Sequence, residues 1–207
     1  MVEIFNARVY DLEESVIACR NAMRTEAADM TPEEFKASIA RARVLAAAPS
    51  NSGHPNFLTG IRVSFDIKYP NYFSPELQRY NFLDIVTSSS KMHKIMVMAN
   101  DPKAYNKYVN QASLDNMKKL VESYNWACET GSLEDQYEAF MAVISNCPQG
   151  LELFMRCSTN YMQLRNIYNQ RKNHKLKEDW GTFCRFIENL PYASDFITQD
   201  SAPKDAA

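Results

Sequence analysis

The sequence has 207 residues, of which 45% are hydrophobic and 23% are charged, and its formal net charge is -2. This length suits one domain, and this composition excludes a disordered chain. The small net charge gives the chain as a whole no electrostatic reason to bind nucleic acid or a membrane surface. No apolar run of about 18 residues occurs and no signal-peptide pattern opens the sequence, so we expect a cytoplasmic protein.

Hydrophobic periodicity predicts strands and helices in the first third of the chain. Alternation of apolar and polar residues predicts strands over 2–10 and 60–69. Asp11 is expected to cap a helix that follows the first strand. The pattern Thr31-Pro32-Glu33-Glu34 has a capping residue followed by proline at the first helical position, and it predicts a helix that runs to about Ala48.

The rest of the chain has mainly helical signals. Further helices are expected over 74–84, 86–98, 102–127, 133–146, 150–172 and 176–189. The predicted fold class is therefore α+β, a helix-rich single domain with a small sheet. We place the domain at 1–195 and a flexible C-terminal tail at 196–207.

Several common kinds of site find no support in the sequence. The five cysteines form no CxxC pair, which argues against a disulfide framework or a zinc site. The three histidines lie far apart and fit no metal-binding spacing. Nucleophile-elbow, P-loop and Rossmann patterns are also missing. We therefore predict no metal site.

Two polar clusters remain as candidate anion sites. In the stretch PELQRYNFLDIVTSSSKMH, over 75–93, arginine, lysine and hydroxyl side chains would be able to bind a phosphate. The alternative is a helix start capped by Thr87 or Ser88, with Lys91 solvated. In the stretch over 163–177, Arg165, Asn169 and Lys172 share one helical face, which is equally consistent with a solvated surface.

Taken together, 53–93 and 163–190 resemble the flavin-dependent thymidylate synthase family. The hallmark of that family is Arg-His-Arg, then seven residues, then Ser, and Arg79-Tyr80-Asn81 with Ser89 keeps this spacing. Gly53-His54 and the strand sequence Val63-Ser64-Phe65-Asp66-Ile67 resemble the family's upstream pattern. Gln163-Leu164-Arg165 with Asn169 resembles its Asn-x-Arg motif near the carboxyl end.

The resemblance implies an enzyme that methylates a pyrimidine deoxynucleotide monophosphate such as dUMP at C5. It implies FAD as cofactor, NADPH and methylenetetrahydrofolate as co-substrates, a homotetramer, and no enzyme nucleophile. The protein then contributes binding, orientation and electrostatics. The implied flavin-binding residues are His54, Asn56, Arg79, Tyr80, Asn81, Arg165 and Asn169. The implied nucleotide-binding residues are Glu76, Ser89, Ser90, Lys91, Arg171 and His174.

The sequence also departs from the family pattern. Tyr80 and Asn81 replace a histidine and an arginine, and Glu76 replaces a glutamine, where a carboxylate would repel phosphate. The arginine expected near position 147 is missing, and Arg156 would replace it only if the backbone differs. Three alternatives follow: a different substrate such as dCMP or a hydroxymethyl product, a flavin- or nucleotide-binding homologue without catalysis, and a helical interaction protein with an accidental likeness.

Overall fold

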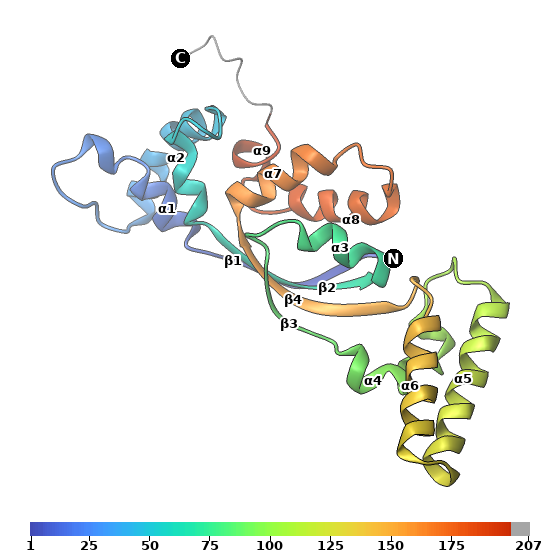
Figure 1. Cartoon of the computed structure of the whole chain (residues 1–207). Helices are drawn as coiled ribbons and strands as arrows, with labels where there is room; N and C mark the ends of the chain where they lie inside the picture. The colour runs from blue at the N-terminus through green and yellow to red at the C-terminus, as the bar shows by residue number, and fades with distance from the viewer. Residues whose placement is uncertain (200–207) are drawn as a thin grey trace. The chain divides into compact units, whose positions relative to one another are not determined.

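A computed structural model describes residues 1–199 of the chain, which form helices and a small antiparallel sheet (Figure 1). The strands are β1 (Glu3–Tyr10), β2 (Arg62–Pro70), β3 (Asp84–Ser88) and β4 (Glu152–Asn160), paired in the order β1-β2-β4-β3. The expected α+β class, rich in helix with a small sheet, is confirmed. Within the described residues, no helix is long and apolar enough to cross a bilayer.

The α-helices are α1 (Leu12–Ala18), α2 (Pro32–Ala47), α3 (Ser74–Gln78), α4 (Lys91–Ala99), α5 (Gln111–Thr130), α6 (Leu133–Asn146), α7 (Tyr161–Arg171), α8 (Lys177–Glu188) and α9 (Ala193–Phe196). Short 3₁₀ turns are η1 (Asn21–Met23), η2 (His54–Thr59), η3 (Asn71–Phe73) and η4 (Pro102–Ala104). Thr31 caps α2 as expected, since its hydroxyl accepts the N–H of Glu34 at 3.2 Å.

The described chain forms two compact units. The hairpin unit comprises Met1, 68–79 and 87–155, and the main unit comprises 2–67, 80–86 and the described residues from Arg156 on. The single domain expected over 1–195 stays a prediction. The predicted first residue of the flexible tail, 196, is too early in the sequence, because Phe196 and Ile197 are buried. The rest of the predicted tail, 200–207, lies outside the described residues.

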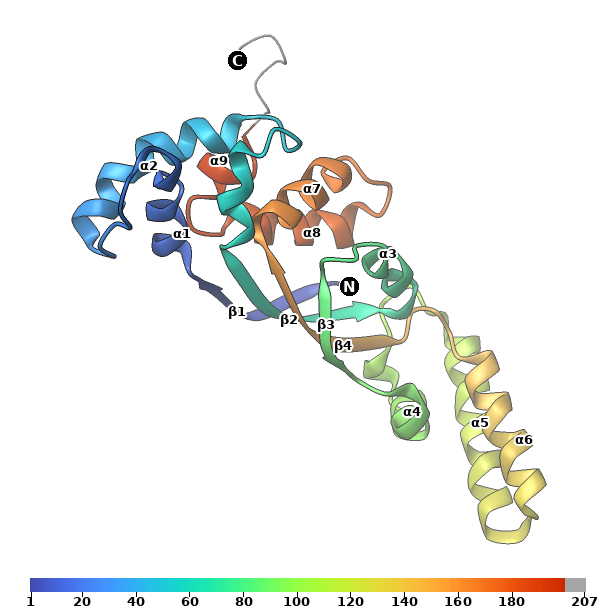
Figure 2. The ribbon, with the colours of Figure 1, turned by 60° about the vertical axis from the view of Figure 1, so that its left-hand side comes forward.

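The core of the main unit lies between β2 and α8. Alternation along β2 buries Val63, Phe65 and Ile67 completely. Phe65 meets Phe183 and Phe186 of α8, with ring centroids 5.8 Å and 5.0 Å apart. Figure 2 shows α7 and α8 on one side of the strands. The buried face of the sheet therefore supports the helices that carry the candidate residues of the carboxyl-terminal third.

The opposite face of β2 carries polar side chains that pair with neighbouring strands. Arg156 of β4 donates to Asp66 at 3.2 Å and to the carbonyl of Asn6 at 3.0 Å. Asn6 has a left-handed backbone, with φ 51°, and donates to the same carboxylate at 2.6 Å. These bonds hold Arg156 on β4 as a structural residue. Its substitution for the missing family arginine near position 147 stays a prediction.

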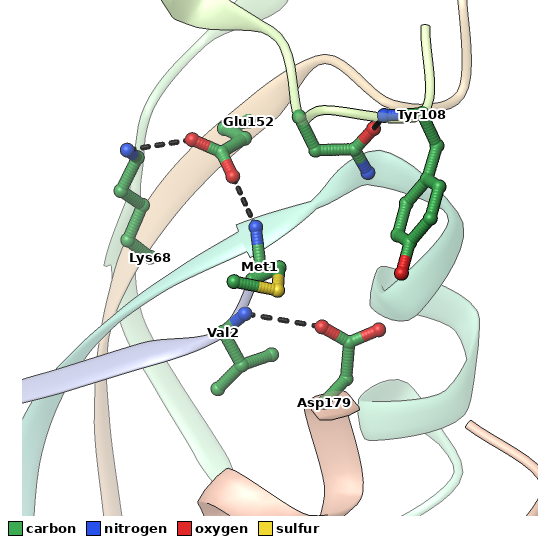
Figure 3. A network of polar contacts seen from close by, with 7 residues as sticks. Met1, Val2, Lys68, Tyr108, Glu152 and Asp179 are labelled. Carbon is green, nitrogen blue, oxygen red and sulfur yellow. Dashed lines mark hydrogen bonds and ion pairs between the residues drawn. The ribbon is translucent and has the colours of Figure 1, made fainter. Parts of the chain in front are cut away.

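The hairpin unit is built around the antiparallel pair α5 and α6. Their connection ends with Ser132, which forms a capping box with Asp135 at the start of α6. Met117, Val121 and Val143 are buried between the helices. The same unit holds a buried carboxylate, Glu152. Figure 3 shows Glu152 with Lys68, 2.6 Å away, on one side and the Met1 ammonium on the other.

Five predictions on secondary structure were wrong in part. Asp11 has a left-handed backbone and its side chain caps no helix. The helix expected over 74–84 ends at Gln78, and the one expected over 86–98 begins only at Lys91, because β3 precedes it. The helix expected over 102–127 begins at Gln111. The stretch expected to begin a helix at 150 forms the strand β4.

Candidate functional site

The two units divide the predicted site residues between them. Glu76, Arg79, Ser89, Ser90 and Lys91 lie in the hairpin unit. The main unit holds His54, Asn56, Tyr80, Asn81, Arg165, Asn169, Arg171 and His174. No cluster of His, Cys, Asp or Glu within residues 1–199 has a metal-binding arrangement.

A cavity of about 610 Å³ in the main unit brings together two predicted flavin-binding residues, His54 and Asn56. It lies among α1, α2 and η2. Gly53, with φ 79°, begins η2 in a left-handed conformation that favours glycine. At Gly60 a Cβ atom would collide with the Ser15 hydroxyl, so glycine lets η2 approach α1 closely. The cavity volume falls in the usual range for small-molecule sites.

The cavity wall carries positive charge and a thiol. Arg41 and Cys19 both line it. Arg20 and Arg24 form ion pairs with Glu34, whereas Arg41 has no ion-pair partner within the described chain. Burial raises the pKa of the Cys19 thiol, although the neighbouring arginines oppose that shift. The cavity therefore favours an anionic ligand and holds a protonated thiol, which is a poor nucleophile.

Arg165, a third predicted flavin-binding residue, lies in the interior of the main unit with only 2% of its surface exposed. It donates to the carbonyl of Ala46 at 2.5 Å and to the Ser50 hydroxyl at 2.8 Å. Burial lowers the pKa of this guanidinium. These bonds fasten the end of α2 to α7, so the structure gives Arg165 a structural role. Its part in flavin binding stays a prediction.

Tyr80 and Arg171 meet in the main unit. The Nε of Arg171 donates to the Tyr80 hydroxyl at 2.6 Å. That hydroxyl donates in turn to Gln170 at 3.1 Å. The guanidinium carbon of Arg171 lies 4.6 Å from the ring centroid of Trp180, within cation–π range. Asn81 and Asn169, the other predicted residues nearby in sequence, are exposed.

Arg171 also lines a pocket of about 360 Å³ at the turn between α7 and α8, which includes His174. Lys172 and Lys177 are further lining residues. Three basic side chains and a histidine around one pocket favour a multiply charged anion such as a phosphate. The structure thus brings together two of the predicted nucleotide-binding residues, Arg171 and His174.

In the hairpin unit, the predicted phosphate-binding residues surround the start of α4. Ser90 caps α4, because its hydroxyl accepts the N–H of His93 at 3.4 Å. The capping residue is therefore Ser90, and not Thr87 or Ser88 as the alternative interpretation held. Ser89 is bonded to β4, since its hydroxyl accepts the N–H of Phe154 at 3.1 Å.

Lys91, at the first position of α4, is held in place by Asn71. Its ammonium donates to the Asn71 side chain at 3.0 Å, and Asn71 donates to Gln149 at 2.8 Å. Lys91 is thus directed by a partner and is not simply solvated. Glu76 is half-buried in α3, and Arg79 follows that helix as an exposed residue.

Sequence reasoning missed several residues that shape these sites. Asn71 directs Lys91, Gln170 accepts from Tyr80, and Arg41 lines the larger cavity. Asn71 follows the strand that the sequence predicts over 60–69. Its position indicates the end of that strand but does not reveal Lys91 as its hydrogen-bond partner. Arg41 lies on a predicted helix whose charged residues are typical of a surface. Only the tertiary structure reveals these three contacts.

The fold is that of flavin-dependent thymidylate synthases. Two solved structures of the enzyme ThyX from Helicobacter pylori, both with FAD and dUMP, match the chain with a TM-score of 0.62. They are 17% and 16% identical in sequence, and each match covers 96% of this chain and 99% or 98% of the other. No family model matches the sequence, and no curated protein is similar to it in sequence. The likeness therefore shows the fold.

Proposed function

We propose that the protein binds FAD and a pyrimidine deoxynucleotide monophosphate such as dUMP, and methylates the nucleotide at C5. The observation that carries this proposal is the likeness to two structures with FAD and dUMP, which extends over 96% of the chain. The preserved spacing of Arg79 and Ser89 supports it independently of the fold. A half-buried, protonated Cys19 agrees with chemistry that uses no enzyme nucleophile.

The residues of the main-unit cavity fit a flavin. Its volume of about 610 Å³ suits part of a large cofactor, and His54 and Asn56 offer polar contacts. Arg41 offers a positive charge to a phosphate of the cofactor. When bound, FAD would supply the hydride that the chemistry needs, and the protein would orient the reactants and exclude water. Arg79, Tyr80, Asn81, Arg165 and Asn169 remain proposed flavin contacts from the resemblance alone.

The nucleotide phosphate would be held by basic side chains that the structure already fixes in place. Lys91 is directed by Asn71, and Arg171 by Tyr80. Each charge-assisted hydrogen bond to a phosphate would contribute about 1.5–3 kcal/mol. Ser89 and Ser90 would add hydroxyl donors, and His174 would add an imidazole. Glu76 would face the nucleotide only if its charge is compensated.

The remaining parts of the proposal come from the resemblance. NADPH and methylenetetrahydrofolate would be the co-substrates, and the protein would act as a homotetramer. A cytoplasmic location is proposed from the sequence pattern alone. Exposed apolar side chains of the hairpin unit, such as Trp126, Leu133 and Tyr137, agree with self-association. The replacements at Tyr80 and Asn81 favour two alternatives, a changed substrate or product such as dCMP or a hydroxymethyl group, and a homologue that binds without catalysis.

Tritium release tests the catalytic part of this proposal. Purified protein would be incubated with FAD, NADPH, methylenetetrahydrofolate and either dUMP or dCMP labelled at C5. Because C5 modification replaces the C5 proton, we expect tritium to appear in water from one of the two nucleotides. Release from neither would contradict catalysis. Binding of FAD and nucleotide in the same samples would then favour the non-catalytic homologue.

A further inference from the structure

Tyr80 takes the second position of the altered Arg-Tyr-Asn triplet, and its hydroxyl is committed to protein partners. It accepts from Arg171 Nε at 2.6 Å and donates to Gln170 Oε1 at 3.1 Å. The rings of Tyr80 and Trp180 meet edge to face, with centroids 6.2 Å apart. Both aromatic residues therefore lie against one arginine that is only 9% exposed.

This arrangement restricts how the guanidinium of Arg171 can turn. The guanidinium is planar, and a hydrogen bond at Nε fixes that plane from one side. The ring centroids of Trp180 and Tyr80 lie 4.6 Å and 5.5 Å from the guanidinium carbon. A free arginine side chain loses rotamer entropy when it binds a ligand. When the guanidinium is fixed before the ligand arrives, less of this entropy is lost on binding, and the ligand meets a preorganised cation.

The fixed guanidinium contributes to a basic pocket. Arg171 lines the 360 Å³ pocket together with Lys172, His174 and Lys177. Arg171 is the most buried of these basic side chains. Its orientation therefore depends on the surrounding residues more than that of the other three. A phosphate in this pocket would meet one preorganised cation, Arg171, and two exposed lysines, Lys172 and Lys177.

We propose that Tyr80 is a positioning residue, whose hydroxyl orients Arg171 toward the phosphate of a nucleoside monophosphate bound in this pocket. The identity of the ligand rests on the proposed function, whereas the orienting contact rests on the geometry alone. Tyr80 would thus act through Arg171 and would not touch the nucleotide itself. The substitution in the triplet would change how the phosphate is recognised, and would not abolish its recognition.

The test compares Tyr80→Phe with the matched control Tyr168→Phe. Tyr168 lies on α7 and its hydroxyl donates to Glu188 at 2.9 Å, so the control also removes one tyrosine hydroxyl. Isothermal titration calorimetry would measure the affinity for dUMP and for deoxyuridine, which lacks the phosphate. We expect Tyr80→Phe to weaken dUMP binding about tenfold and to leave deoxyuridine binding unchanged. Tyr168→Phe should change neither.

Unchanged dUMP affinity in Tyr80→Phe, or equal losses for both ligands, would overturn the positioning role and leave the proposed function intact. If the unaltered protein binds neither dUMP nor deoxyuridine, the proposed function fails. Inorganic pyrophosphate would then be the probe, and Tyr80→Phe should still weaken its binding. An unchanged pyrophosphate affinity, or no pyrophosphate binding by the unaltered protein, would overturn the inference.

A second variant keeps the inference testable if Tyr80→Phe does not fold. Arg171→Lys retains the charge but lacks the Nε donor and the planar group. We expect it to lose affinity for dUMP and not for deoxyuridine. When both single variants fold, the double variant should lose no more than Arg171→Lys alone, because the two residues act through one contact. Additive losses would contradict that coupling.

Discussion

Arg165 shows, at the scale of single residues, that a residue can fit a binding motif and still lie in the interior. Its guanidinium bonds to Ala46 and Ser50, which are far away in the sequence. The Nε atom has no hydrogen-bond partner within residues 1–199. A buried cation without an acidic partner is expensive to desolvate, so its two acceptors must be essential for this packing.

Replacing this arginine should therefore affect folding before it affects binding. We expect Arg165→Ala to lower the free energy of unfolding by about 2 kcal/mol or more, because two acceptors lose their donor and a cavity forms. Urea denaturation would measure the change. The control is Arg43→Ala, which removes an exposed ion pair with Asp195 and should lower stability by less than about 1 kcal/mol. A fully stable Arg165→Ala that fails to bind FAD would favour the direct flavin contact instead.

Glu152 is a second residue with a defined structural role. Burial by itself would raise the pKa of this carboxyl, but hydrogen bonds from Lys68 and the Met1 ammonium outweigh that effect (Figure 3). The pKa therefore lies below its ordinary value of 4.5. A carboxyl with a lowered folded-state pKa stabilises the fold above its unfolded-state pKa, and the stabilisation is lost as the pH falls through the folded-state value.

Stability measured against pH tests this assignment. At pH 7 the unaltered protein should have a higher free energy of unfolding than Glu152→Gln, because the variant loses two ion pairs. The difference should shrink as the pH falls below 4.5, where Glu152 becomes protonated. Chemical denaturation at a series of pH values would record both curves. A difference that does not change with pH would show that the ionised carboxylate is not the stabilising species.

At the scale of elements, local patterns predicted those parts of the fold that have strong local signals. The bounds expected for α6 match the structure, and those for α2 and β1 differ by one residue at one end. All of β4 was mistaken for a helix, although Leu153, Met155 and Cys157 are buried in strict alternation. β3 was missed because all five of its residues are exposed, which leaves no apolar face to recognise.

Glycine positions give a direct test of how closely two elements approach. Gly150 precedes β4, and a Cβ atom there would lie 2.7 Å from the Asn106 side chain and would also collide with Val109. We expect Gly150→Ala to lower the free energy of unfolding by about 1–3 kcal/mol. Gly181 lies inside α8 with no contact closer than 3.5 Å, so Gly181→Ala should raise stability by about 0.5–1 kcal/mol. Thermal unfolding of both variants would check the opposite signs.

At the scale of the whole molecule, the sequence predicted the fold better than the contacts of the candidate site residues. The spacing of Arg79 and Ser89 pointed to the correct fold, as the two solved structures show. The contact between Tyr80 and Arg171 joins residues 91 positions apart, and no local pattern encodes it. The cavity around His54 likewise depends on how α1, α2 and η2 pack. Tertiary packing therefore decides which of the predicted residues line a cavity.

The proposed binding of a flavin is tested by the visible absorption spectrum of the protein. The purified protein would be incubated with excess FAD, passed through a desalting column and examined between 350 and 500 nm, roughly the range where oxidised flavins absorb. We predict that flavin absorbance elutes with the protein, in about equimolar amount. A protein that stays colourless after this treatment would contradict the account.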